Sequence, residues 1–184
     1  GEGVFGSLLA PFVEHVLRGD SKDFGFIAAA QAVGGIAGGV LAAAVSRRLP
    51  AAKLLSYGAV GLGVVDLAIF LYPIGYVAVW PAIAGMILAG LPSALSVAGM
   101  VTLLQRASDD SYRGRVFGTL GAVQGIAILA GTLAAGFLSR DLGIISVIAI
   151  QGAAWVLAGL GMMVWLRKGA ADLTTRYEIP VEAG

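Results

Sequence analysis

The chain is poor in charge. Only 12% of its 184 residues are charged, and 58% are hydrophobic. A soluble domain carries about 25% charged residues, because its surface must face water. So few charges exclude an ordinary water-soluble globule, and the apolar residues must face lipid or other helices within a membrane.

The sequence has no cysteine and a single histidine, His15. Disulfides, thiolate metal sites and cysteine nucleophiles are therefore excluded, and a zinc site is not expected. The net charge of +1 offers no basic excess for nucleic acid. A serine hydrolase would need His15 as its base, and no Gly-x-Ser-x-Gly motif accompanies it. We expect no enzymatic activity, no metal site and no cofactor.

The chain contains several long apolar runs. A transmembrane helix needs about 20 mostly apolar residues, and polar turns divide the sequence into segments of that kind. The runs are too long for strands and do not alternate. We predict an all-α membrane protein with six helices, over residues 1–16, 24–45, 53–71, 77–104, 116–138 and 142–166.

The two ends and the turns carry further expectations. The first segment is too short to span alone, so we interpret it as the second half of a helix in a longer protein. Ser21 or Asp23 is a candidate cap for the second helix, and Pro81 and Pro92 are candidate kinks in the fourth. Residues 1–168 form the predicted transmembrane domain, and residues 169–184 a loose, polar tail.

Basic residues are divided unequally between the two sets of loops. The positive-inside rule assigns the richer set to the cytoplasm, which places the C-terminus there, in a plasma membrane. The richer set holds nine basic residues, namely Arg47, Arg48, Lys53, Arg106, Arg113, Arg115, Arg167, Lys168 and Arg176. The poorer set holds only three, namely Arg18, Lys22 and Arg140.

A weak internal repeat joins two segments three helices apart. The matches at one constant offset are Phe24-Gly25, Gln31 and Ser46-Arg47 with Phe117-Gly118, Gln124 and Ser139-Arg140. Three crossings invert the second copy relative to the first, and inverted repeats are a hallmark of secondary transporters. The pattern favours a 3+3 inverted repeat, with chance similarity between two Ala- and Gly-rich helices as the alternative.

Two segments resemble the major facilitator superfamily. Residues 103–117, which end in Arg113-Gly114-Arg115-Val116-Phe117, resemble the loop between its tenth and eleventh helices in the bacterial branch of enterobactin and macrolide exporters. Residues 38–53 resemble its Gly-rich loop, with Ser46 where that loop usually has an acid. The resemblance covers nearly the whole chain before the tail and identifies it with the C-terminal six-helix half of that fold.

The resemblance implies a partner and a mechanism. The missing N-terminal six-helix half would complete the fold, and the two halves would rock around a central site. The implied function is proton-coupled efflux of an amphipathic small molecule, such as a drug or a siderophore, from a bacterial inner membrane. A stand-alone six-helix channel or membrane scaffold is the alternative.

Ionisable residues within a span are functional candidates, because they are costly in lipid. Glu2 lies near mid-membrane on a helix that lines the family's cavity, where it can bind a proton or a cation, unless it is simply a solvated terminus. Asp66 is either a coupling residue or a partner in a structural hydrogen bond, to a backbone group or to Tyr57.

Neutral polar residues are cavity candidates. Gln31 and Gln124 are matched by the repeat and can bind substrate or bridge helices. Ser93 and Ser96 flank Pro92 on a helix that the family uses to line its cavity, with packing as the alternative.

A cluster of charges is predicted on the cytoplasmic side. Its ion pairs can form an inner gate, or the arginines can simply orient the protein and bind lipid headgroups. The members are Arg47, Arg48, Asp109, Asp110, Arg113 and Arg115.

Overall fold

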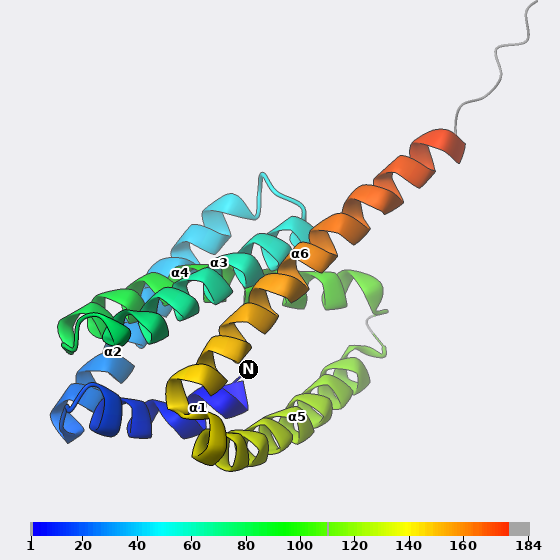
Figure 1. Ribbon diagram of the computed structural model, residues 1–184. Coiled ribbons are helices and arrows are strands. Elements are labelled where there is room, and N and C mark those ends of the chain that lie inside the picture. Colours follow the sequence, from blue (N-terminus) through cyan, green and yellow to red (C-terminus); the bar gives the residue numbers. More distant parts are fainter. Residues whose placement is uncertain (1, 110, 177–184) are drawn as a thin grey trace, which may run out of the picture.

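The computed structural model describes residues 2–109 and 111–176, which form helices joined by short turns (Figure 1). In chain order the elements are α1 (Glu2–Pro11), the π-helical turn η1 (Phe12–Val16), α2 (Ser21–Val45), α3 (Ala51–Leu71), the 3-10 turn η2 (Tyr72–Ile74), α4 (Trp80–Ala107), α5 (Arg113–Leu142) and α6 (Ile144–Arg176).

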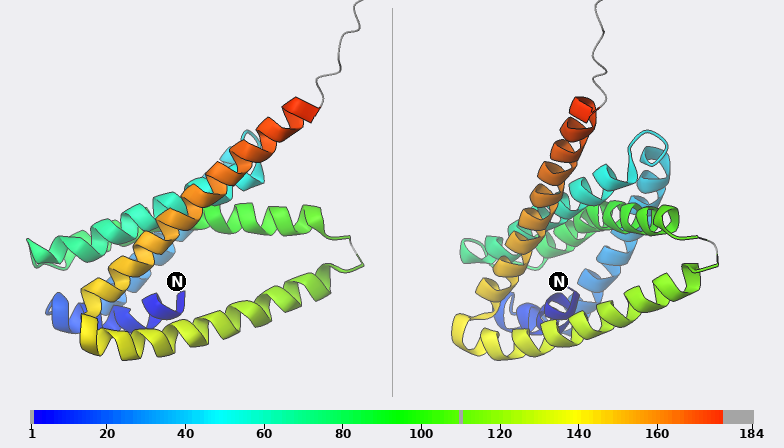
Figure 2. Two further views of the ribbon diagram at one scale, coloured as in Figure 1. Left: turned by 45° about the vertical axis from the view of Figure 1, so that its right-hand side comes forward. Right: turned by 90° about the vertical axis from the view of Figure 1, so that its right-hand side faces the viewer.

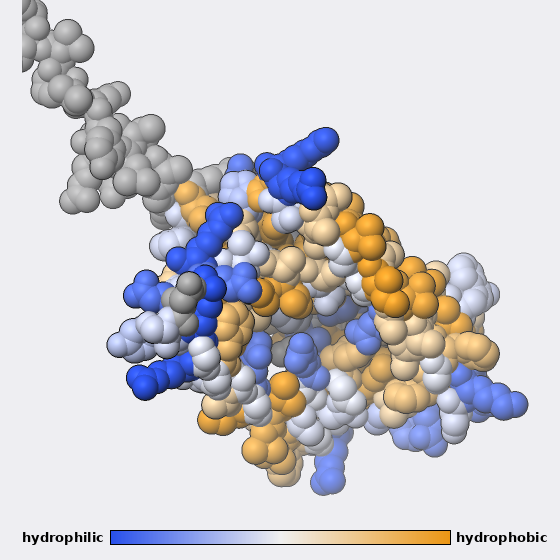
Figure 3. All heavy atoms as spheres, turned by 180° about the vertical axis from the view of Figure 1, so that it is seen from behind, coloured by the Kyte–Doolittle hydropathy of each residue, from blue (hydrophilic) through white to orange (hydrophobic). Residues whose placement is uncertain are grey.

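Five of these helices are long and apolar enough to cross a membrane. They are α2, α3 together with η2, α4, α5 and α6, whereas α1 is too short to span alone. Large apolar side chains cover their outer surfaces, among them Ile36, Ile126 and Trp165, each more than 70% exposed. Figure 3 shows apolar residues across one face of the molecule, with the most hydrophilic side chains near its margins. The chain is therefore a multi-pass membrane protein.

Helix α4 packs against both α2 and α3 through glycines. A Cβ atom added to Gly90 of α4 would collide with the backbone of Gly34 and Gly35, and one added to Gly34 would collide with the backbone of Ile87. Gly38 meets Gly90 and Ala94 one turn further along. Small residues allow this close approach, on which helix association in lipid depends.

Helices α1 and α5 make a second crossing of the same kind. A Cβ atom at Gly3 would collide with the backbone of Ile128, and Gly131 lies against Gly3 and Val4. The hydroxyl of Thr132 also donates a hydrogen bond to the Gly3 carbonyl, at 3.1 Å. In the two similar sequence segments, Gly131 occupies the position that Gly38 occupies in α2. Helix α2 starts at the end of the bundle where α5 finishes, so the two helices run in opposite senses (Figure 2).

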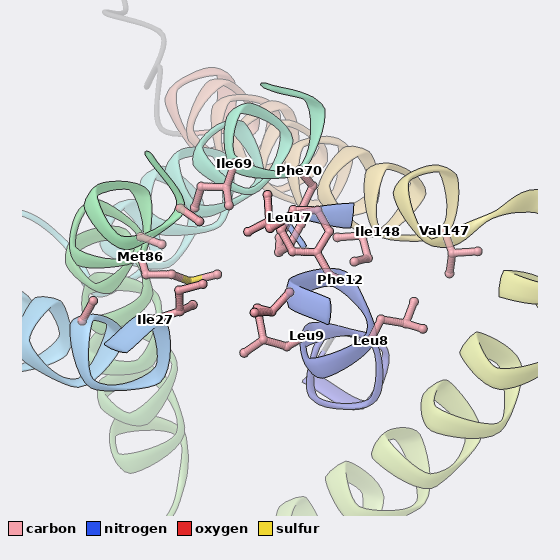
Figure 4. Packing of buried hydrophobic residues seen from close by; sticks show 14 of the residues in the cluster. Leu8, Leu9, Phe12, Leu17, Ile27, Ile69, Phe70, Met86, Val147 and Ile148 are labelled. Atoms are coloured by element: carbon pink, nitrogen blue, oxygen red, sulfur yellow. The ribbon is translucent and has the colours of Figure 1, made fainter. Parts of the chain in front are cut away.

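An apolar core joins α1, η1, α3 and α6. The rings of Phe12 and Phe70 pack edge to face, with centroids 4.7 Å apart, and Ile148 of α6 belongs to the same cluster. Figure 4 shows these three side chains meeting between their helices. The core sets where α6 lies relative to α3 and the short N-terminal segment.

Several details differ from the sequence predictions. The N-terminal cap of α2 is Asp20, whose carboxylate accepts hydrogen bonds from the backbone N–H groups of Lys22 and Asp23. In return, the Asp23 carboxylate accepts a hydrogen bond from the Asp20 backbone N–H. Ser21 is the first residue of the helix. Because α4 starts at Trp80, Pro81 lies in its first turn, where proline fits, and only Pro92 lies inside the helix.

The ends of the chain differ as well. The first segment reaches Val16 as predicted, but it changes to a π-helical turn after Pro11, which lacks the N–H that would continue the α-helix. The last helix, predicted to end near residue 166, continues to Arg176. The predicted loose tail from residue 169 therefore begins in a helix.

The glycine crossing makes a stability prediction. We expect Gly90→Ala to destabilise the folded chain by about 1–3 kcal/mol, because the new methyl group forces α4 away from α2. Gly39→Ala is the matched control, since its Cβ would meet nothing within 4 Å. Thermal unfolding in detergent, followed by circular dichroism, measures both, and equal melting temperatures for the two variants would contradict the crossing.

Candidate functional site

A cavity of about 540 Å³ lies between α1, α4 and α5, with Leu55 of α3 and Trp155 of α6 completing its wall. Most of its lining is apolar, including Met100, Phe117 and Ile128. The face in Figure 3 is visibly hollowed near its centre. Three polar side chains that the sequence singled out line this one cavity: Glu2, Ser96 and Gln124.

Glu2 reaches the cavity from the first turn of α1. Its side chain is exposed, and the next residue, Gly3, is held against α5 by the crossing with Ile128 and by the Thr132 hydrogen bond. The position of the Glu2 backbone is therefore fixed by α5. Gln124 lies on α5 about one turn before Ile128 and lines the same cavity.

Ser96 lies where α4 meets α3. It is 7% exposed, and its hydroxyl has no hydrogen-bond partner among the described residues. The hydroxyl faces Gly58, where a Cβ would collide with it. By contrast, the hydroxyl of Thr102 donates to the Ala98 carbonyl of its own helix, at 2.7 Å. An unpaired buried hydroxyl beside a cavity is a group that a bound molecule can satisfy.

The other predicted membrane residues lie elsewhere. Gln31 of α2 is exposed, as Gln124 is, but it does not line the cavity that Gln124 lines. Ser93 is half-buried on α4, and Asp66 is buried on α3 with 5% of its surface exposed. None of these three residues lines the cavity.

The predicted gate residues lie around two separate shallow pockets. Asp109 and Arg113 line one of them, where an Arg113 Nη2 donates to the Gln105 carbonyl at 3.4 Å. Arg47 and Arg48 line the other, at the end of α2. The guanidinium of Arg115 lies 5.7 Å from the ring centroid of Tyr112, and Asp110 lies outside the described residues.

The sequence prediction missed Trp155. Trp155 of α6 is not among the candidate residues of the sequence analysis, but it lines the cavity. It also lines a second cavity, of about 400 Å³, together with Val4, Gln151 and residues of α5. A large aromatic ring amid the small residues of α6 was the available signal. Within the described ranges, no group of three His, Asp or Glu residues gathers as metal ligands.

The hydrogen bond between α5 and α1 makes a second prediction. Removing its donor with Thr132→Val is expected to lower stability by about 0.6 kcal/mol, which is typical of a side-chain hydrogen bond between membrane helices. Thr119→Val is the control, because the Thr119 hydroxyl bonds only the Arg115 carbonyl of its own helix. Chemical unfolding in mixed micelles would compare the free energies of unfolding of the two variants. If Thr132→Val loses no more stability than Thr119→Val, the hydrogen bond between α5 and α1 does not stabilise the fold.

Comparison with protein families shows to which family this helical bundle belongs. The model of the Major Facilitator Superfamily matches residues 1–179. Comparison with curated proteins and with solved structures gave no significant match. Five spanning helices and a family match over nearly the whole chain agree with each other. The chain belongs to the Major Facilitator Superfamily, a family of membrane transporters.

Proposed function

We propose that this chain is the C-terminal six-helix half of a transporter that exports amphipathic small molecules in exchange for protons, by alternating access. The observation that carries the proposal is the cavity in which Glu2, Ser96 and Gln124 interrupt an apolar wall. Sites for small molecules have this composition, with a few polar groups that fix orientation within an apolar pocket.

The wall favours a substrate with an apolar body and a polar end. Met100, Phe117 and Trp155 offer soft and aromatic surface, which adapts to different apolar shapes. Gln124 can both donate and accept hydrogen bonds, and the unpaired Ser96 hydroxyl can do the same. A drug-like molecule or a siderophore has both features.

Proton coupling is proposed for Glu2 because, among the residues that the structure describes, it alone lines this cavity with an ionisable side chain. A carboxylate within a membrane is costly unless it binds a proton, a cation or a partner. Exchange of a proton for substrate at Glu2 would couple the two movements without a further group.

The packing supports the proposed inverted repeat. Helix α4 contacts α2 and α3, and α1 contacts α5 and α6 in the same way. Each set has a close backbone crossing at glycine, at Gly38 with Gly90 and at Gly3 with Ile128. The first helix of each three-helix unit thus packs on the second and third helices of the other unit. A missing N-terminal six-helix half would supply the opposite wall of the transport pathway.

The loop charges support the proposed orientation. Arg47, Arg48, Arg113 and Arg115 lie at or beside the α2–α3 and α4–α5 connections, which face the cytoplasm under the positive-inside rule. We propose a bacterial inner membrane with a cytoplasmic C-terminus, and an inner gate that includes Asp109 and Asp110.

Glu2→Gln tests proton coupling in the full-length transporter. The amide keeps the shape of the side chain but cannot release a proton, so proton-driven efflux should fall at least tenfold while substrate binding persists. Efflux from proteoliposomes under an imposed pH gradient is the measurement.

Glu14→Gln is the matched control for this experiment, because Glu14 is an exposed carboxylate on η1 outside the cavity. It should transport like the parent protein. Unchanged pH-driven efflux by Glu2→Gln would remove Glu2 from the mechanism.

The chain reconstituted alone makes a further prediction. If it is half of an alternating-access transporter, liposomes that contain only residues 1–184 should show no saturable substrate flux. Saturable flux, or steady ion conductance in a planar bilayer, would instead favour a stand-alone carrier or channel.

A further inference from the structure

Two buried polar residues, Asp66 and Gln151, have no role in the proposed cavity. Asp66 of α3 is 5% exposed and Gln151 of α6 is 8% exposed. Gln151 Oε1 has no hydrogen-bond partner among the described residues, and no described residue forms a hydrogen bond or an ion pair with Asp66. Buried polar groups are seldom left unpaired, so each needs an explanation.

The crossing of α3 and α6 places these two residues at one level. A Cβ at Gly63 would collide with Gly152 and Val156, and one at Gly159 with Val60 and Ser56. As residue numbers rise along α3, those of their contacts on α6 fall, so the two helices are antiparallel.

The apolar core fixes the register one turn away. Phe70 and Ile148 belong to the same buried cluster and lie close together in Figure 4. One helical turn back from Phe70 is Asp66, and about one turn forward from Ile148 is Gln151. Because the helices are antiparallel, both steps lead in the same direction along the crossing. Asp66 and Gln151 therefore occupy the layer between the Phe70–Ile148 contact and the Gly63–Gly152 contact.

The surroundings offer Asp66 no counter-charge. Residues 144–166 of α6 carry no charge, and the only charge on α4 is Arg106 at its far end. Glu2, Glu14 and His15 are the titratable groups of α1 and η1. On α3 itself Lys53 and Tyr57 are exposed, and the Tyr72 hydroxyl of η2 donates to the Ala78 carbonyl.

We propose that Asp66 and Gln151 form a proton-binding site within the α3–α6 crossing. With a proton bound, the neutral carboxyl donates a hydrogen bond to Gln151 Oε1, and both orphaned groups are satisfied. Without the proton, the Asp66 carboxylate can accept only from the Gln151 amide N–H, after the amide turns over, and it remains a buried charge with no counter-charge. This site is separate from Glu2 and does not depend on transport.

The proposal predicts pH-dependent packing with a definite sign. Raising the pH removes the proton and leaves an unpaired buried charge, so the folded chain loses stability as pH rises. Asp66→Asn stays neutral at every pH and should remove that dependence.

Infrared difference spectroscopy of the 184-residue chain in lipid nanodiscs tests the site directly. A protonated-carboxyl band that titrates with pH is expected in the parent chain and should vanish in Asp66→Asn. Gln151→Met keeps the side-chain length but removes the amide, and should shift that band and change the pH at which it titrates. Gln31→Leu, an exposed amide on α2, is the control and should leave the band unchanged.

Two results would overturn the site. One is the absence of a protonated-carboxyl band assigned to Asp66 at any pH from about 5 to 9. The other is an identical band and titration in Gln151→Met. If that variant does not fold, Gln151→Asn serves instead, because its shorter amide cannot make the same contact. Transport is not measured, so failure of the proton-coupled export proposal leaves this test unaffected.

Discussion

Close approach of helix backbones at glycine is the constraint on which this bundle depends. Lipid is as apolar as the helix surfaces, so burial from water cannot hold the helices together. Direct backbone contact provides the attraction instead, at Gly34 and Gly90, at Gly3 and Ile128, and at Gly63 and Gly152. These crossings fix α4 on α2 and α3, α1 on α5, and α6 on α3. The cavity is the space that they leave between α4, α5 and α1.

The same constraint explains where polar groups are tolerated. A side chain on the outside of α2 or α5 meets lipid, whereas Glu2 and Gln124 project into a cavity that can hold water or substrate. Ser96, Asp66 and Gln151 are buried near the helix crossings, although Ser96 also borders the larger cavity and Gln151 the smaller one. Buried polar groups need a partner, and the two proposals assign a substrate to Ser96 and a shared proton to Asp66 and Gln151.

The helices could be predicted from the sequence because apolar length alone specifies a spanning segment. Their exact ends could not, since a single capping contact such as Asp20 with Asp23 decides them. The sequence also indicated Glu2, Ser96 and Gln124, each as a separate candidate. It did not indicate Trp155, because its large ring stands out on α6 but the sequence does not show which face of that helix points inward. Gln31 shows the limit of the repeat. Gln31 and Gln124 match in sequence and are both exposed, but only Gln124 lies beside the cavity, because sequence similarity between two helices does not fix which neighbours each of them meets.

In the proposed transporter half, two three-helix units cross the membrane in opposite senses, and side-specific labelling tests this arrangement most directly. The chain has no cysteine, so Ser46→Cys and Ser139→Cys each introduce a unique thiol at matched positions of the two units. A membrane-impermeant maleimide applied to oriented vesicles should label the first from the cytoplasmic side and the second only from the opposite side. Labelling of both residues from the same side would contradict the inverted arrangement.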